Sequence, residues 1–220
     1  MNAYFSTDDA VREYLPLMHE LAIRIELVAQ AFEGKLNLPP LYAREYAYLQ
    51  FRYICELIAL GCLQLHGDLP IASSGKAIKE WNAEKIMTQL HNDNPHAFPQ
   101  SAIREKTSIL VNQKPNALTR EDFKVLYNEC GDVLHKGTIR KAKASFLESK
   151  HNYNQIIDWQ NKIVNLMNEH FISRAEGKGF YIISLRTTSG YPECIIYTPN
   201  PQGGLNAEIR KMNLINNYEN

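Results

Sequence analysis

Two groups of charged side chains in this chain of 220 residues have a spacing that suits chemistry. In the first, Arg52 stands between Glu45 and Glu56, and on a helix the three side chains fall within about 40° of one another. Carboxylates on either side of a guanidinium can hold it in one orientation. Such an arginine can bind an anion or a phosphate, or it can be paired internally and serve only packing.

The second group begins with Asp132 and His135, three residues apart on a predicted helix, where the carboxylate can orient the imidazole. The only dense cluster of cations follows within eight residues: Lys136, Arg140, Lys141 and Lys143. An oriented histidine beside cations that bind phosphates can cleave a phosphodiester by acid–base chemistry. The structural alternative is that His135 and Lys136 complement the helix dipole and that the charge run is a solvated face.

Composition and motifs argue against several other functions. The formal net charge is zero, with 24 basic and 24 acidic residues, which disfavours a nucleic-acid coat or a polybasic membrane binder. No phosphate-binding loop, dinucleotide fingerprint, nucleophile elbow, HExxH or EF-hand pattern is present, so we expect no cofactor. We expect reduced, buried thiols and no metal site, because four cysteines lack zinc spacing: Cys55, Cys62, Cys130 and Cys194.

The element that positions Arg52 is the longest apolar segment of the chain, residues 41–67, which contains no proline and is predicted to form one long central helix. A helix with Pro16 inside its pattern precedes it over residues 6–34. Further helices are predicted over residues 75–92, 119–135 and 140–176. Residues 101–115 are ambiguous, with strand character at 107–111.

The pattern changes after residue 176. The segments FYIISLRT and ECIIYT flank a turn that contains glycine and proline, which is the clearest hairpin signal in the chain. One more short element is expected near residues 205–212. We therefore predict a mainly α fold of one domain. About five helices form a bundle over residues 1–176, and a small C-terminal antiparallel β-hairpin with its tail, 177–220, packs on it.

The first residues, MNAYFSTDDAVREYL, have neither the basic nor the apolar region of a signal peptide. The charges in residues 41–67, among them Arg44 and Arg52, disfavour a membrane span. We expect a cytoplasmic protein that does not bind membranes.

The central segment FRYICELIALG, the later segment LYNECGDVLHKG and the helices around them resemble the helical bundles of the HEPN superfamily, over residues 10–175. The resemblance implies a domain of prokaryotic conflict and mobile-element systems. In active members it implies a metal-independent ribonuclease with an arginine and a histidine at a dimer interface. In that pattern the histidine follows the arginine by about four to six intervening residues. No arginine precedes His135 at that distance, and the match from Arg12 to His19 contains Pro16.

These observations leave three functional hypotheses. The leading one is a non-enzymatic binding or assembly module that forms a homodimer or binds another protein, because long apolar helices can bury more surface than one bundle covers. The alternative is a HEPN-like ribonuclease or toxin component with RNA as its partner, which uses Arg52 and His135 with Asp132. The third is a sensor of a small anion or nucleotide centred on Arg52.

Overall fold

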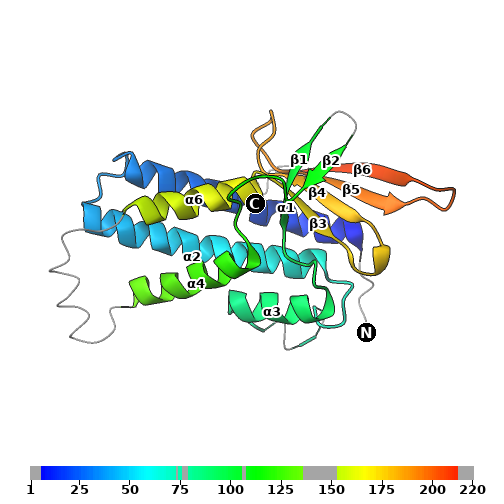
Figure 1. The fold of residues 1–220 in the computed structure, drawn as a ribbon, viewed down its shortest axis with the longest axis horizontal. Helices are drawn as coiled ribbons and strands as arrows, with labels where there is room; N and C mark the ends of the chain where they lie inside the picture. Colours follow the sequence, from blue (N-terminus) through cyan, green and yellow to red (C-terminus); the bar gives the residue numbers. More distant parts are fainter. Residues whose placement is uncertain (1–5, 73, 76–78, 106–107, 136–152, 213–220) are drawn as a thin grey trace, which may run out of the picture.

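A computed structural model describes residues 6–72, 74–75, 79–105, 108–135 and 153–212 (Figure 1). The described residues contain five α-helices, which are α1 (Thr7–Phe32), α2 (Pro40–Leu65), α3 (Ala83–Asp93), α4 (Arg120–Leu134) and α6 (Tyr153–Met167). They also contain six strands, which are β1 (Gln100–Arg104), β2 (Ile109–Val111), β3 (Glu169–Ser173), β4 (Phe180–Ser184), β5 (Glu193–Pro199) and β6 (Leu205–Lys211). A short 3-10 turn, Ala175–Gly177, lies between β3 and β4.

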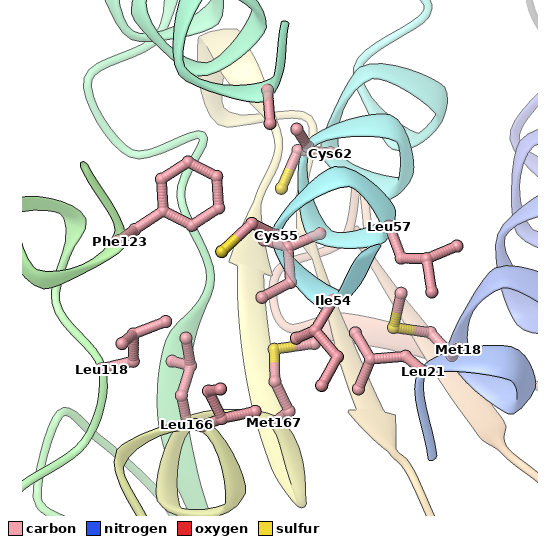
Figure 2. Close-up of a cluster of buried hydrophobic side chains, with 14 of the residues drawn as sticks. Met18, Leu21, Ile54, Cys55, Leu57, Cys62, Leu118, Phe123, Leu166 and Met167 are labelled. Atoms are coloured by element: carbon pink, nitrogen blue, oxygen red, sulfur yellow. The ribbon is translucent and has the colours of Figure 1, made fainter. Parts of the chain in front are cut away.

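The predicted central helix is confirmed as α2, which contacts α1, α3, α4 and α6. A helix that is apolar on nearly all sides must be covered on all sides, and the other four helices provide that cover. Figure 2 shows part of the resulting core, where side chains of α2 meet side chains from α1, α4 and α6. The labelled members are Met18, Leu21, Ile54, Cys55, Leu57, Cys62, Leu118, Phe123, Leu166 and Met167.

At Gly61, α2 packs tightly against α1. A Cβ added at Gly61 would lie 2.6 Å from Cε2 of Tyr14, whose ring is fully buried. Any larger residue would therefore have to push this ring out of place. The glycine inside the apolar run thus lets an aromatic ring lie against the backbone of α2.

Local signals set the helix starts as predicted. Ser6 caps α1 by accepting a hydrogen bond from the backbone N–H of Asp9, and α1 continues through Pro16. At the start of α4, Thr119 and Asp122 form a capping box in which each side chain accepts from the other's backbone N–H.

The six strands form one antiparallel sheet in the order β2-β1-β3-β4-β5-β6. Directly opposed residues point to the same face of a sheet, so the register separates the two faces. The face toward the helices is buried, and α1 and α6 contact it. Its buried residues include His170, Ile172, Tyr181, Ile183, Cys194 and Ile196.

The outer face of the sheet carries apolar side chains that cover one another. Phe171, Phe180 and Tyr197 form a row across β3, β4 and β5, with ring centroids 5.0 Å and 4.7 Å apart. A second row opposes Ile182 to Ile195 and Ile195 to Ile209. This second row ends at β6, where Ile209 is 55% exposed.

The predicted fold class is wrong, because the sheet is large and the fold is a mixed one of helices and a six-stranded sheet. The predicted hairpin exists as β4 and β5, but β3 pairs with β4 along its whole length and β1 extends the sheet beyond β3. The sheet therefore runs across the boundary predicted at residue 176. The predicted helix over 140–176 lies outside the described residues as far as residue 152, agrees with α6 up to Met167 and is wrong from residue 168 onward.

The physical reason lies in the sequence EHFIS, residues 169–173. Its inward residues alternate with its outward ones, as a strand requires, and its partner FYIIS lies only a few residues later. Pairing between the two segments outweighs the helical pattern that precedes them. The helix predicted over 75–92 also begins later, at Ala83, where the Asn82 side chain caps it, and this leaves Trp81 71% exposed.

No helix in the described ranges combines the length and the apolar character needed to cross a bilayer.

Candidate functional site

Arg52, the residue at the centre of the first predicted site, lies between α2 and α4. Its Nε donates a hydrogen bond to Oε1 of Glu56 at 2.9 Å, and its Nη2 donates to Oη of Tyr127 at 2.7 Å. The guanidinium carbon is also 4.1 Å from the centroid of the Tyr127 ring. Burial by itself lowers the pKa of Arg52, but the hydrogen bond to Glu56 and nearby negative groups raise it by more. Arg52 is therefore a paired cation that joins two helices.

The same cluster reaches a third helix. The Tyr127 hydroxyl accepts a hydrogen bond from the backbone N–H of Ala83, at the start of α3, at 3.4 Å. Glu56 holds Arg52 from one turn later on α2, as predicted, whereas Glu45 is half-buried two turns earlier. The cluster thus fixes the relative positions of α2, α3 and α4.

His135 lies at the C-terminal end of α4. It is exposed, and its backbone N–H donates to the carbonyl oxygen of Gly131 at 3.0 Å. A Cβ added at Gly131 would lie 3.9 Å from Nη1 of Arg52, so the turn before His135 is the one that borders Arg52. No hydrogen bond joins Arg52 to His135 in the described part of the chain. Asp132 is exposed.

The four predicted phosphate-binding cations lie outside the described residues: Lys136, Arg140, Lys141 and Lys143.

A half-buried carboxylate that the sequence did not single out lies beside the Arg52 cluster. Glu129 of α4 accepts a hydrogen bond from the hydroxyl of Tyr48 on α2 and a second, at 3.0 Å, from the indole Nε1 of Trp159 on α6. Burial and the neighbouring carboxylate raise the pKa of Tyr48. The signal in the sequence is an acid among the apolar residues that α4 buries, next to Cys130. Glu129 therefore ties α2, α4 and α6 together.

Two histidines, His66 and His170, are fully buried. The His170 Nδ1 faces the carbonyl oxygen of Met167 at 2.9 Å and must carry the proton, so its Nε2 accepts from the Tyr14 hydroxyl at 2.6 Å. Burial lowers the pKa of His170 to about 4. The ring thus links β3 to α1 and is sealed from substrate.

His66, at the C-terminal end of α2, has a similar environment. Its Nδ1 lies 2.8 Å from the carbonyl oxygen of Cys62, and its Nε2 lies 3.1 Å from the carbonyl oxygen of Ser173 and 3.2 Å from Nδ2 of Asn94. Burial lowers the pKa of His66, although the hydrogen bonds to the two carbonyl oxygens oppose this shift. As for His170, its hydrogen bonds stabilise the fold.

The thiols are no better placed for chemistry. All four cysteines are free and buried, as predicted. Burial raises the pKa of Cys62 and of Cys130 to about 12, so neither supplies a thiolate at neutral pH. No cluster of three metal-binding side chains occurs among the residues that the structure describes.

The outer edge of β6 differs from the interior, because its backbone groups have no partner strand in the described residues. Met212 N–H donates to the carbonyl oxygen of Pro192, which places position 212 in a hydrogen-bonded pair with β5. Such pairs alternate along a ladder, so the backbone groups of positions 206, 208 and 210 face β5, whereas those of Leu205, Ala207, Ile209 and Lys211 face outward. The sequence predicted an element here but could not show that it forms an edge.

Comparisons with protein-family models, with curated proteins and with solved structures find no match to this chain. The resemblance to the HEPN superfamily therefore stays a prediction.

Proposed function

We propose that this chain is an assembly module that self-associates, and that β6 pairs with β6 of a second copy around a two-fold axis. The observation that carries the proposal is the outward edge of β6, seven residues long and paired without a bulge to β5 on its other side. Free strand edges recruit further strands, and proteins that avoid such pairing interrupt the edge with charged side chains, proline, bulges or a covering segment. The sequence of β6, LNAEIRK, contains no proline, and its charged residues carry both signs, so two copies can pair them.

Side chains on the outer face support the same partner. Ile209 ends the row that begins with Ile182 and Ile195, and it is 55% exposed. A second β6 beside the first would continue this row with a second Ile209 and remove apolar surface from water. Leu205, on the same face and 53% exposed, adds to the apolar surface at this edge.

Charge selects one register. Residues of β6 whose backbone groups face outward must lie opposite residues of the same kind in the second copy. The allowed registers therefore differ from one another in steps of two residues. When Ile209 opposes Ile209, Glu208 opposes Arg210 of the second copy, twice. When Ala207 opposes Ile209, two Glu208 carboxylates face each other, and like charges in that position are destabilising. When Ala207 opposes Ala207, Glu208 meets Asn206 and no ion pair forms.

We therefore expect the register centred on Ile209. In this register Arg210, which bonds Asp8 and Glu208 of its own chain, also lies opposite a carboxylate of the second copy. Two reciprocal pairs of opposite charge and a central apolar pair would then determine the interface.

The test is the mass of the particle in solution. Sedimentation velocity at micromolar concentration should give twice the 25.3 kDa of one chain. The Ile209→Lys variant should sediment as a monomer, because two lysines would meet on the axis. Val125→Lys is the matched control, since Val125 on α4 is also 55% exposed, and it should remain a dimer.

A backbone variant separates strand pairing from side-chain packing. Ala207→Pro removes one outward N–H and leaves the groups that bond β5 in place. It should weaken the dimer while the far-ultraviolet circular dichroism stays that of the wild type. A monomeric wild type, or dissociation caused by Val125→Lys alone, contradicts the proposal.

The ribonuclease alternative needs an arginine available to RNA. Two of the Arg52 nitrogens already bond Glu56 and Tyr127, and this is why we favour assembly. Incubation of mixed RNA without metal discriminates the two hypotheses, because cleavage that disappears in His135→Ala would favour the ribonuclease.

A further inference from the structure

A pocket of about 400 Å³ lies where the segment before β1 meets the connection from β2 to α4. This volume falls within the range of small-molecule sites, roughly 300 to 1,000 Å³. Its apolar wall includes Phe98, Leu118 and Leu166, and its polar part includes Ser101, Lys114 and the start of α4 at Thr119 and Arg120. Among the described lining residues are two cations and no carboxylate.

The segment that carries Lys114 is held in place. The Asn165 side chain of α6 donates hydrogen bonds to the carbonyl oxygens of Pro115 and Asn116, at 3.2 Å and 3.3 Å. The backbone N–H of Asn112 donates to the carbonyl oxygen of Ser101 at 2.8 Å. A polar group on a fixed segment loses little conformational entropy when a ligand binds.

Two polar groups at the pocket have no bonded partner among the described residues. The Ser101 residue is 1% exposed, and its Oγ has no hydrogen bond in the described structure. Lys114 is half-buried, and among the described residues its ammonium group forms no hydrogen bond or ion pair. The Ser101 Oγ is sealed beneath the pocket wall, so Lys114 is the unpaired group that a polar ligand in the pocket can satisfy.

The charge around the pocket favours an anion. Arg120 also lines the pocket, although its Nη2 bonds the Thr88 hydroxyl at 3.0 Å and lies 3.8 Å from Oε1 of Glu84, which offsets part of its charge. The positive end of the α4 dipole lies at the same place. Burial lowers the pKa of Lys114, as expected for a cation whose partner is absent, although the charge of Glu169 opposes this shift.

We propose that this pocket binds the phosphate group of a small organic phosphomonoester, with Lys114 Nζ as its charged ligand. An ammonium group and a helix N-terminus in the lining of one pocket are a common environment for a tetrahedral phosphate. The organic part would lie against Phe98, Leu118 and Leu166. This site is separate from β6 and does not depend on the proposed assembly.

Phenyl phosphate is a suitable probe, because it combines one phosphate with one apolar ring. Isothermal titration calorimetry should show saturable binding of phenyl phosphate to the wild type, weaker binding of inorganic phosphate and no binding of phenol. Lys114→Met should weaken binding about 10- to 100-fold, since it removes a charged hydrogen bond, whereas Ser101→Ala should not change it, because this hydroxyl is sealed from the pocket.

Lys124→Met is the matched control, because Lys124 lies on α4 outside the pocket lining. This variant should bind phenyl phosphate with the affinity of the wild type. Lys114→Met removes a group without a bonded partner among the described residues, so its melting temperature should not fall, which separates a binding role from a structural one. The proposal is overturned if phenyl phosphate does not bind the wild type at millimolar concentration, or if Lys124→Met weakens binding as much as Lys114→Met does.

Discussion

Two half-buried cations, Arg52 and Lys114, have opposite environments. Arg52 bonds Glu56 and Tyr127, and its pKa is raised because these partners outweigh burial. Lys114 has no bonded partner in the described residues, and its pKa is lowered because burial dominates. The residue that drew attention in the sequence is thus committed to structure, whereas the one that did not is available to a ligand.

The same contrast holds for larger parts of the molecule. In the helical core the polar groups of Glu129 and His170 bond partners on other elements, so each links elements distant in sequence. At the outer edge of β6 the backbone groups of alternate residues have no partner among the described strands. Groups without partners, rather than reactive residue types, indicate where this chain can bind something.

The largest expected effect is at Glu129. Glu129→Ala leaves the Tyr48 hydroxyl and the Trp159 N–H buried without an acceptor, and should lower the free energy of unfolding by about 3 to 4 kcal/mol. Glu129→Gln keeps one acceptor and should lose about 1 to 2 kcal/mol. Urea unfolding measures both values. A loss below about 0.5 kcal/mol for Glu129→Ala would mean that the hydrogen bonds to Glu129 do not stabilise the fold, and would contradict the comparison.

The next effect is a dependence of stability on pH. The pKa of His170 is about 4 in the folded chain and 6.5 as its ordinary value, so the unfolded chain binds more protons between these values. The stability contributed by neutral His170 is complete above pH 6.5 and is lost as the pH falls to 4, by about 3 kcal/mol.

The control is His170→Asn, whose amide nitrogen can replace Nδ1 but does not titrate. Unfolding curves recorded from pH 7 to pH 4 should show a smaller pH slope for this variant than for the wild type. Equal pH slopes for the wild type and His170→Asn would mean that the folded chain does not lower the pKa of His170. That result would contradict the contrast between groups paired inside the fold and groups left without partners.

The smallest effect separates the two cations directly. Arg52→Met should lower the free energy of unfolding by about 1 to 2 kcal/mol, because a charged hydrogen bond to Glu56 is lost. Lys114→Met should change it by less than about 0.5 kcal/mol, or raise it, because no bond is lost and a half-buried charge is removed. Urea titrations of both variants at pH 7 test this order, and the reverse order would refute the comparison.

The helical half of the fold could be predicted because its signals are local. The long apolar run around Ile54, the cap at Ser6 and the capping box at Thr119 each depend on residues close in sequence. The sheet could not, because β3 is a strand only by virtue of its pairing with β1 and β4. A five-residue strand after a helix carries too short a pattern to be distinguished from the end of that helix.

The candidate sites divide in the same way. The pairing of Arg52 with Glu56 follows from helical spacing and was predicted. Tyr127 and Glu129 could not be placed, because their partners lie on other helices. Among the described residues, Ser101 Oγ and Lys114 lack partners and the outer edge of β6 has no neighbouring strand. Both depend on which groups the fold leaves uncovered, and no spacing in the sequence reports that.

The most direct test of the proposed assembly is a cysteine cross-link at its axis. With Ile209 opposite Ile209, the two Cα atoms lie about 5.5 Å apart, within the range of a disulfide. Because the four native cysteines are buried, mild oxidation of Ile209→Cys should give a covalent dimer on a non-reducing gel, and Ala207→Cys should stay monomeric. No cross-link at either position would contradict the pairing of β6 with a second β6.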